Sequence, residues 1–480
     1  MTYQVPEHIS KDKIFIVKKS EIEGRLEPNF YKPSIATLER KLRSLSSKRL
    51  RSYAQSFAGG ATPSKRESEK YYSDSQIGIP FLRVQNLQTN GELSLNECIY
   101  INEETHNGLL KRSQVSGGDL LVKITGVGRM AIASVAPKGF VGNTNQHMVV
   151  IKTGDSSISK YLAHYLNLDI IEQIASRHST GGTRPALDYP SLKNIPIIEG
   201  LDFSIIDNAI RVKKTKENEA QQLLDSIDAY LLNELGIAIP EIKTELTDRV
   251  FYVNYSELSN RLDPYYSLNY FKESFEAIYS GKYPVVQLKS LATLITSGIT
   301  PKSGGDAYVD DQLNGIPFIR SGNINIDGEL NFEDLLYIKA DIHNTIMRSS
   351  QVKKNDLMIA IVGATIGQVG IYLNKNEANI NQAIALVRLK DSICVQYIKE
   401  LIKSRIGQLS LNRLKRPVAR ANINLEEIAT IQIVLPPYET QLKIANQIQN
   451  IRQKAKALQT EGKTILENAK KEVEQMIMEK

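Results

Sequence analysis

The feature that most constrains the fold of this 480-residue chain is an internal repeat that spans nearly its whole length. Matching segments recur at an almost constant offset of about 236 positions, so the second half of the chain follows the first in register. The clearest pairs are Ser20–Pro28 with Ser256–Pro264, Ile79–Arg83 with Ile316–Arg320, Gly91–Leu93 with Gly328–Leu330, and Asn145–Gln146 with Asn381–Gln382. The repeat predicts two domains of the same fold.

Each copy predicts a domain of mixed α and β structure followed by one long helix. Short apolar runs at residues 119–124 and 147–151, with partners at 356–361 and 383–387, are typical of strands. One helix is expected at Ser159–Ser176 and another at Cys394–Gln408. The predicted boundaries are residues 1–200 for the first domain, 201–237 for a central helix, 238–436 for the second domain and 437–480 for a C-terminal helix.

Both long helices carry an apolar stripe that predicts helix pairing. In the second helix, apolar or small residues alternate spacings of three and four from Ile448 through Gly462 to Met476, which is the pattern of a coiled-coil seam. We expect the helices to pack against each other as an antiparallel coiled coil, or to bind a helix of a partner protein. The expected contact residues are Leu223, Leu224, Ile227, Leu231, Ile451, Leu458, Ile465 and Val473.

Composition and charge narrow the function classes. Two cysteines and six scattered histidines provide no disulfide framework and no metal-ligand spacing, so no metal is expected. No apolar run is long enough to span a membrane, and we expect a cytoplasmic protein with no membrane partner. The net charge is +7, and the stretches Lys41–Arg51 and Lys403–Arg420 hold several basic residues and no acidic one. Such stretches suit a polyanion such as DNA, although a solvated basic face would give the same pattern.

Taken together, these segments resemble the specificity subunits of Type I restriction-modification systems. The resemblance covers essentially the whole chain. It rests on the repeated Ile-Pro-Phe-Leu/Ile-Arg segment, on the glycine-punctuated strand Ile361–Gly370, on Asn379–Gln382, and on Arg420–Leu425 leading to Leu435–Pro437. The first copy matches more loosely. The resemblance implies an α/β (mixed α+β) fold with two tandem target-recognition domains separated by long helices that form an antiparallel coiled coil.

The same resemblance implies a function without catalysis in this chain. Such a subunit binds a bipartite, asymmetric site on double-stranded DNA and recruits two adenine-methyltransferase subunits, and ATP-dependent restriction subunits can join the complex in phage defence. The methyl donor and ATP belong to those partners, so no cofactor is expected here. Two alternatives stay open, namely a DNA-recognition subunit of another defence assembly and a coiled-coil scaffold that does not bind DNA.

Two segments imitate catalytic motifs and are interpreted as structural. Leu435–Tyr438 is similar to the Asn/Asp-Pro-Pro-Tyr motif of adenine methyltransferases, but Leu435 has no polar group to hold the target base. We expect the two prolines to precede the start of a helix. Gly462–Thr464 is similar to the end of a phosphate-binding loop, but it lies within a predicted helix, so Gly462 is predicted to be a small seam residue.

DNA contacts are expected from basic and amide side chains in loops, because Arg, Lys, Asn and Gln recognise base edges and phosphates. Residues that both copies share are expected to support the fold or to contact phosphate, since the two domains would bind different bases. The unshared Lys65, Arg66, Arg129, Lys415 and Arg416 are therefore favoured for specificity. The full set of candidates is Lys65, Arg66, Arg129, Asn145, Gln146, Arg177, Arg184, Lys302, Asn381, Gln382, Arg413, Lys415, Arg416 and Arg420.

Overall fold

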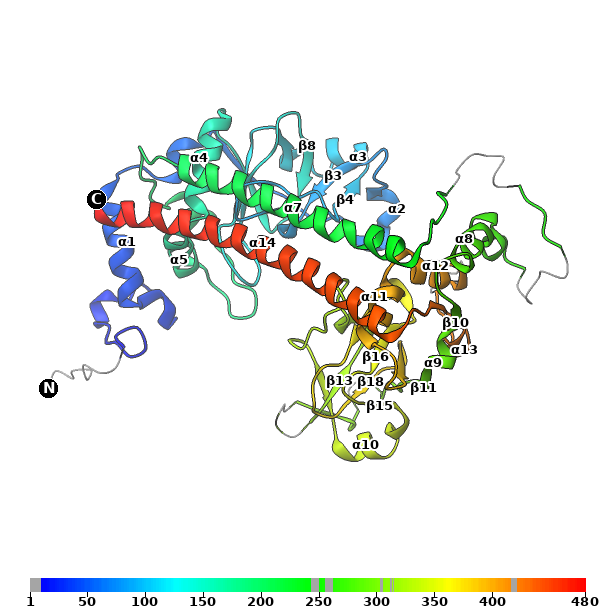
Figure 1. The fold of residues 1–480 in the computed structure, drawn as a ribbon. Helices are drawn as coiled ribbons and strands as arrows, with labels where there is room; N and C mark the ends of the chain where they lie inside the picture. Colours follow the sequence, from blue (N-terminus) through cyan, green and yellow to red (C-terminus); the bar gives the residue numbers. More distant parts are fainter. Residues whose placement is uncertain are drawn as a thin grey trace. The chain divides into compact units, whose positions relative to one another are not determined.

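The computed structural model describes residues 10–242, 250–254, 262–302, 305–310, 313, 315–415 and 421–480. The chain divides into two compact units. The first contains Met1–Glu217 with Gln459–Lys480, and the second contains Asn218–Leu458. Most of the repeat at Ser256–Pro264, and the candidates Arg416 and Arg420, lie outside the described residues. Figure 1 follows the elements of each unit along the sequence.

The first unit is built on two small sheets. One has the strand order β1-β9-β6-β7 and the other β2-β4-β3-β8-β5. All paired neighbours are antiparallel except β3 and β8, which run parallel with Phe81 opposite Asn143. The strands are β1 (Ser56–Gly59), β2 (Tyr72–Ser73), β3 (Ile79–Leu82), β4 (Ile99–Ile101), β5 (Gln114–Ser116), β6 (Leu120–Lys123), β7 (Ala133–Val135), β8 (Val141–Thr144) and β9 (Met148–Lys152).

The second unit repeats both sheets strand for strand. Its sheets have the orders β11-β19-β16-β17 and β12-β14-β13-β18-β15, again with one parallel pair, β13 and β18. A further two-stranded sheet joins β10 (Val285–Gln287) to β20 (Gln432–Val434). The other strands are β11 (Ala292–Ser297), β12 (Tyr308–Val309), β13 (Ile316–Ile319), β14 (Leu336–Ile338), β15 (Gln351–Val352), β16 (Leu357–Ala360), β17 (Val369–Ile371), β18 (Ala378–Ile380) and β19 (Ile384–Leu389). Two tandem domains of mixed α and β structure are therefore present, as the repeat predicted.

Most of the helices occupy equivalent sequence positions in the two units. The first unit has α1 (Pro33–Leu45), α2 (Ser68–Tyr71), α3 (Glu103–Asn107), α4 (Ser156–Leu166), α5 (Asp169–His178) and α6 (Tyr189–Lys193). The second has α8 (Asn269–Tyr279), α9 (Leu288–Leu291), α10 (Ala340–Asn344), α11 (Val395–Lys403), α12 (Arg405–Leu414) and α13 (Leu425–Ala429). The long helices are α7 (Ser204–Leu235) and α14 (Tyr438–Glu479).

The single helix predicted after the sheet is wrong in both copies, because each is divided into two. In the first unit the buried Asn167 separates α4 from α5. Its Nδ2 donates to the Ala133 carbonyl at 2.7 Å and its Oδ1 accepts from the Ala133 amide at 3.2 Å. In the second unit the buried Ser404 has extended backbone between α11 and α12, and its hydroxyl donates to the Leu401 carbonyl. Short polar side chains compete for backbone hydrogen bonds in this way and end helices.

The glycine-punctuated strand predicted at Ile361–Gly370 is also corrected. Only its last residues belong to a strand, β17, and Gly363–Thr365 form a short 3-10 turn. Gly363 and Gly367 have φ angles of 79° and 93°, a left-handed backbone that does not continue a strand. The segment is therefore a loop that reverses the chain between β16 and β17.

The helices α7 and α14 pair antiparallel within each unit. In the first unit Lys216 Nζ lies 2.8 Å from Glu461 Oε2, and in the second Lys443 Nζ lies 3.2 Å from Glu234 Oε2. Figure 1 shows the green and red helices side by side. A Cβ added to Gly462 would lie 3.2 Å from the Cα of Lys213, so this glycine permits a close approach of the two backbones. Its predicted role as a small seam residue is confirmed.

The predicted seam is wrong by one position at its C-terminal end, whereas Ala469 and Val473 are buried as predicted. Met476 is 45% exposed, whereas Ile477 is fully buried and Leu466 is 6% exposed. A straight α-helix has 3.6 residues per turn, so a stripe with a strict 3.5-residue repeat drifts away from the contact face. The buried positions of this part are therefore Leu466, Ala469, Val473 and Ile477, of which Leu466 and Ile477 were not predicted.

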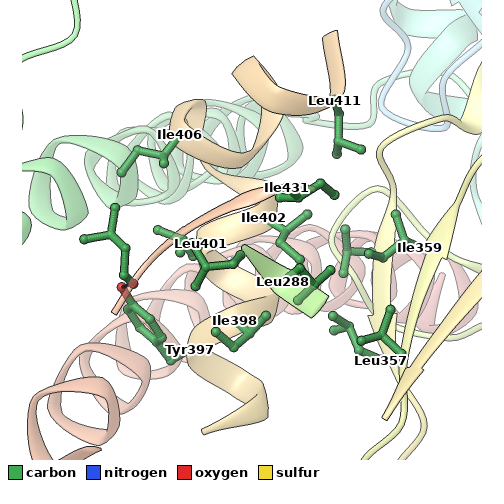
Figure 2. Close-up of a cluster of buried hydrophobic side chains, with 14 of the residues drawn as sticks. Leu288, Leu357, Ile359, Tyr397, Ile398, Leu401, Ile402, Ile406, Leu411 and Ile431 are labelled. Atoms are coloured by element: carbon green, nitrogen blue, oxygen red, sulfur yellow. Dashed lines mark hydrogen bonds between the residues drawn. The ribbon is translucent and has the colours of Figure 1, made fainter. Parts of the chain in front are cut away.

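Each unit has its own apolar core, and the long helices contribute to both. The core of the second unit includes Leu288, Leu357, Ile359 and Ile398, which point toward one another in Figure 2. Tyr397 is buried in the same cluster, and its hydroxyl donates to the Val434 carbonyl at 2.7 Å. Helix residues in this core include Ile227, Leu231, Ile444, Ile448 and Ile451, and those in the first core include Ile206, Ala209, Leu466 and Val473.

Candidate nucleic-acid interface

In the first domain, a turn and two loops meet where strands β1, β6 and β8 end. The turn Asn145–His147 follows β8, and the Thr62 hydroxyl contacts Gln146 Oε1 from the loop after β1. The loop starts at Gly60, where an added Cβ would lie 1.9 Å from the Thr144 carbonyl oxygen. Only glycine permits this crossing of two backbones. We call residues 60–66, 145–147 and 180–186 the first recognition edge.

Backbone hydrogen bonds fix the third part of this edge. Ile124, just after β6, donates to the carbonyl of His147 at 2.9 Å, and its own carbonyl accepts from Leu187 at 2.8 Å. Residues Thr180 and Ala186 pair with each other and close the loop that carries Arg184. The extension of β6 therefore lies between the turn Asn145–His147 and the loop at residues 180–186 and is hydrogen-bonded to the turn and to Leu187, just after the loop.

The second domain builds the same arrangement. A Cβ on Gly298 would lie 1.7 Å from the Ile380 carbonyl oxygen, and the Thr300 amide donates to Gln382 Oε1 at 3.2 Å. Ile361 donates to the Ala383 carbonyl at 2.9 Å and accepts from the Ile423 amide at 3.0 Å. Residues 298–302, 381–383 and 421–422 form the described part of the second recognition edge.

Some predicted DNA contacts lie on these edges with exposed side chains. In the first domain they are Lys65, Arg66, Gln146 and Arg184, and in the second they are Lys302 and Gln382. The amides Asn145 and Asn381 belong to the same turns, but their Oδ1 atoms accept backbone amides two residues on, from His147 and Ala383. These two shared residues therefore shape the turn in both domains.

Other candidates hold parts of their own domain together. Arg129 forms an ion pair with Asp169, and its Nη2 donates to the Asn167 carbonyl at 2.7 Å. Lys415 is half-buried, and its Nζ donates to Asn412 Oδ1 at 2.7 Å. Burial lowers the pKa of Lys415. Both cations have intramolecular partners that a DNA contact would have to replace.

Arg177 and Arg413 occupy equivalent positions and make the same pair of contacts. Arg177 Nε donates to the Phe30 carbonyl at 2.7 Å, and its guanidinium carbon lies 4.6 Å from the centre of the Phe30 ring. Arg413 Nε donates to the Tyr266 carbonyl at 3.1 Å, and its guanidinium carbon lies 4.2 Å from the centre of the Tyr266 ring. Each arginine thus joins the segment before the first helix of its unit, α1 or α8, to a later helix of the same unit, α5 or α12.

Around Arg177 the contact is ionic and buried. Glu39 Oε2 accepts from Arg177 Nη1 at 2.6 Å, and Oε1 accepts from Arg43 at 2.6 Å. Burial by itself would raise the pKa of Glu39, but hydrogen bonds and charges from His178 and Arg43 outweigh it and lower the pKa to about 2. The carboxylate is therefore ionised at neutral pH and is part of the scaffold.

The apolar seam residues are used within the chain. Ile227, Leu231 and Ile451 belong to the core of the second unit, and Val473 belongs to the core of the first. Leu223 and Leu224 pack against the core of the second unit, Ile465 packs against that of the first, and Leu458 is half-buried. A partner protein would thus contact the helices mainly through other faces.

Three residues on or beside the first edge are not among the predicted DNA contacts. Thr62 holds Gln146, Arg112 Nη2 donates to the Gly59 carbonyl at 3.3 Å, and His147 lies between Gln146 and the β6 extension. The repeated Gly-x-Thr-Pro at residues 60–63 and 298–301 was the signal available for Thr62. Among the described residues, no group of three or more His, Cys, Asp or Glu side chains is placed to hold a metal ion.

A comparison with protein families decides what kind of domain this is. Residues 47–198 and 281–468, together more than half of the chain, match the model of the Type I restriction modification DNA specificity domain. The chain belongs to this family. The two matched segments correspond to the two copies of the repeat, so each copy is a DNA specificity domain of the Type I restriction-modification family. No helix of the described ranges is long and apolar enough to span a membrane.

The chain is also similar to individual proteins. A 143-residue region is 33% identical to the Type I restriction enzyme EcoBI specificity subunit of Escherichia coli, and it covers 30% of this chain and 30% of that relative. Among solved structures, a chain of a type I R-M system is similar over 90% of this chain and 95% of its own, with 16% identity and a TM-score of 0.45. The S subunit from M. genitalium is similar over 89% and 95%, with 14% identity and a TM-score of 0.38.

Proposed function

We propose that this protein is the DNA-recognition subunit of a Type I restriction-modification complex, in which each domain binds one half of a bipartite, asymmetric DNA site. Its partners are double-stranded DNA, two adenine-methyltransferase subunits and, in the complex that cuts DNA, ATP-dependent restriction subunits. The observation that carries the proposal is the pair of recognition edges. They have the same backbone frame but differ in part of their exposed side chains, as expected of two domains that bind different sequences.

The charges on the edges support DNA as the ligand. Lys65, Arg66 and Arg184 are exposed cations on the first edge, and Lys302 is one on the second. Gln146 and Gln382 are exposed amides beside them. Cations neutralise phosphates, and arginine and amide side chains form paired hydrogen bonds with guanine and adenine in the major groove. A scaffold that only joins proteins has no need of such edges.

Catalysis is assigned to the partners. Leu435 stands where a methyltransferase motif has a polar residue, and Pro436 accepts a hydrogen bond from Gln441 within the first turn of α14. We expect the purified chain to transfer no methyl group and to hydrolyse no ATP. Methyl transfer to adenine by this chain alone, with the methyl donor supplied, would contradict this assignment.

Binding over a salt series tests the proposal directly. The full chain is incubated with duplexes that carry the methylated motif of the source genome and with scrambled duplexes, at salt concentrations from about 50 to 200 mM. Affinity for the motif is expected to exceed that for scrambled DNA by about 10³-fold or more and to fall steeply as salt rises. A salt-independent or absent interaction with both duplexes would favour the scaffold.

A further inference from the structure

His147 differs from its neighbours on the first recognition edge because the second domain has no equivalent side chain. The adjacent Asn145 and Gln146 recur as Asn381 and Gln382, but the position of His147 is taken by Ala383. The backbone at this position is the same in both domains. The amide donates to the turn asparagine at 3.1 Å in one and 3.2 Å in the other, and the carbonyl accepts from the strand extension at 2.9 Å in both.

The fold therefore does not need an imidazole at this position. Alanine supports the same two backbone hydrogen bonds in the second domain, and the His147 side chain adds none of its own within the described part of the chain. Its Nδ1 is buried and has no hydrogen-bond partner among the described residues. A buried polar atom without a partner is unfavourable, so its retention needs a reason other than stability.

The surroundings of His147 place it at the centre of the candidate DNA contacts. Gln146 precedes it in the chain. Ile124, in the extension of β6, donates a hydrogen bond to the carbonyl of His147 and accepts one from the Leu187 amide. Burial, assisted by the charge of Arg184, keeps the pKa of His147 below its usual range. A neutral imidazole carries one N–H donor and one acceptor, so it can make a directional hydrogen bond.

We propose that His147 is a specificity-determining residue of the first domain, which contacts a base edge in the first half-site through Nε2. The enclosed Nδ1 leaves Nε2 as the atom for the contact. Ala383 offers no polar group at the matching point of the second edge, so the two domains differ there in what they can bind. This inference rests on the proposed function, because it names one residue of the DNA interface.

Reciprocal substitutions test it. The full chain and the variants His147→Ala and Ala383→His are each used to select duplexes from a randomised library, and the bound DNA is sequenced. His147→Ala is expected to reduce discrimination at one base pair of the first half-site by about 2- to 10-fold, the range of one hydrogen bond, and to leave the second half-site unchanged. Alanine at this backbone is tolerated in the second domain, so the variant should fold.

Ala383→His is the matched control, because it adds the same side chain to the equivalent backbone of the other domain. It should leave the first half-site unchanged. The proposal is overturned if His147→Ala leaves the first half-site preference intact, if it alters both half-sites, or if it weakens binding to all sequences equally with a smaller salt dependence, as a phosphate contact would. A wild-type chain that selects no sequence at all would instead refute the proposed function.

Discussion

Equivalent helices, α1 in the first domain and α8 in the second, are held by different kinds of contact. In the first, α1 carries Glu39, whose carboxylate is buried among Arg177, Arg43 and His178. In the second, the equivalent position on α8 is Phe275, and the guanidinium carbon of Arg413 lies 5.3 Å from the centre of its ring. The arginine and its bond to a backbone carbonyl persist, while the partner changes from an acid to an aromatic ring. What the repeat preserves is therefore the position of the contact.

The comparison also explains which shared residues belong to the scaffold. His106 contacts Asn143 and His343 contacts Asn379, in each domain beneath the parallel strand pair. Asp119 Oδ2 lies 3.4 Å from Lys152 Nζ, and Asp356 Oδ2 lies 2.6 Å from Arg388 Nη2. Residues that recur with the same partners shape the domain. Differences between the domains must then arise from residues that recur with different neighbours or do not recur.

The largest expected effect is a difference in stability loss between alanine substitutions of Arg177 and Arg413. Arg177→Ala removes one partner of a buried carboxylate and should lower the free energy of unfolding of the first domain by about 3 kcal/mol. Arg413→Ala removes a cation–π contact and one hydrogen bond and should cost about 1–2 kcal/mol in the second domain. Hydrogen exchange of peptides from α1 and α8 in the full chain measures each domain separately. Equal losses of stability in the two variants would show that the ion pairs of Glu39 add nothing to the arginine–carbonyl contact that both domains share.

A pH-dependent effect of similar size should also distinguish the domains. The pKa of Glu39 is lowered by folding, so its contribution is fully present above its unfolded pKa and is lost as pH falls through about 2. A shift of this size corresponds to about 3 kcal/mol, lost mainly between about pH 5 and pH 2.

Glu39→Gln is the control for that pH dependence. It should destabilise the first domain at pH 7 and make little difference at pH 2, where the wild-type carboxyl is about half protonated and has lost most of its contribution. The stability of the second domain, which has Phe275 at the equivalent position, should not change when Glu39 is substituted in the first. Calorimetric unfolding of both proteins across this range provides the measurement, and a wild-type and variant difference that stays constant with pH would contradict the role of Glu39.

The smallest effects concern exposed cations on the first edge. Lys65→Ala and Arg66→Ala should each lower the slope of log affinity against log salt by about 1 if the side chain neutralises a phosphate. Lys138→Ala is the control, because Lys138 is equally exposed but lies in the loop before β8, at the other end of that strand. A slope that responds to Lys138 as much as to Lys65 would place the DNA elsewhere on the domain.

The sequence predicted the architecture because periodic signals are additive over many residues. The repeat, the strands near residues 120 and 150, and the starts of the long helices were all apparent. The sheet order was not, since pairing β3 with β8 joins residues far apart in the chain. The intramolecular partners of Arg129, Arg177 and Arg413 were not predicted, because a basic residue in a loop or at a helix end has no sequence signature that distinguishes an intramolecular partner from a phosphate. His147 was not predicted, because a single histidine has no sequence signature that distinguishes a DNA contact from a structural residue.

Exchange of one domain tests the central claim most directly. Residues of about 1 to 200 are replaced by the same domain of a relative that recognises a different site, and the methylated motif is determined from DNA modified in cells. Two independent recognition domains predict that one half of the motif changes to that of the relative while the other half stays the same. A motif in which both halves change together would contradict the claim that each copy of the repeat binds its own half-site.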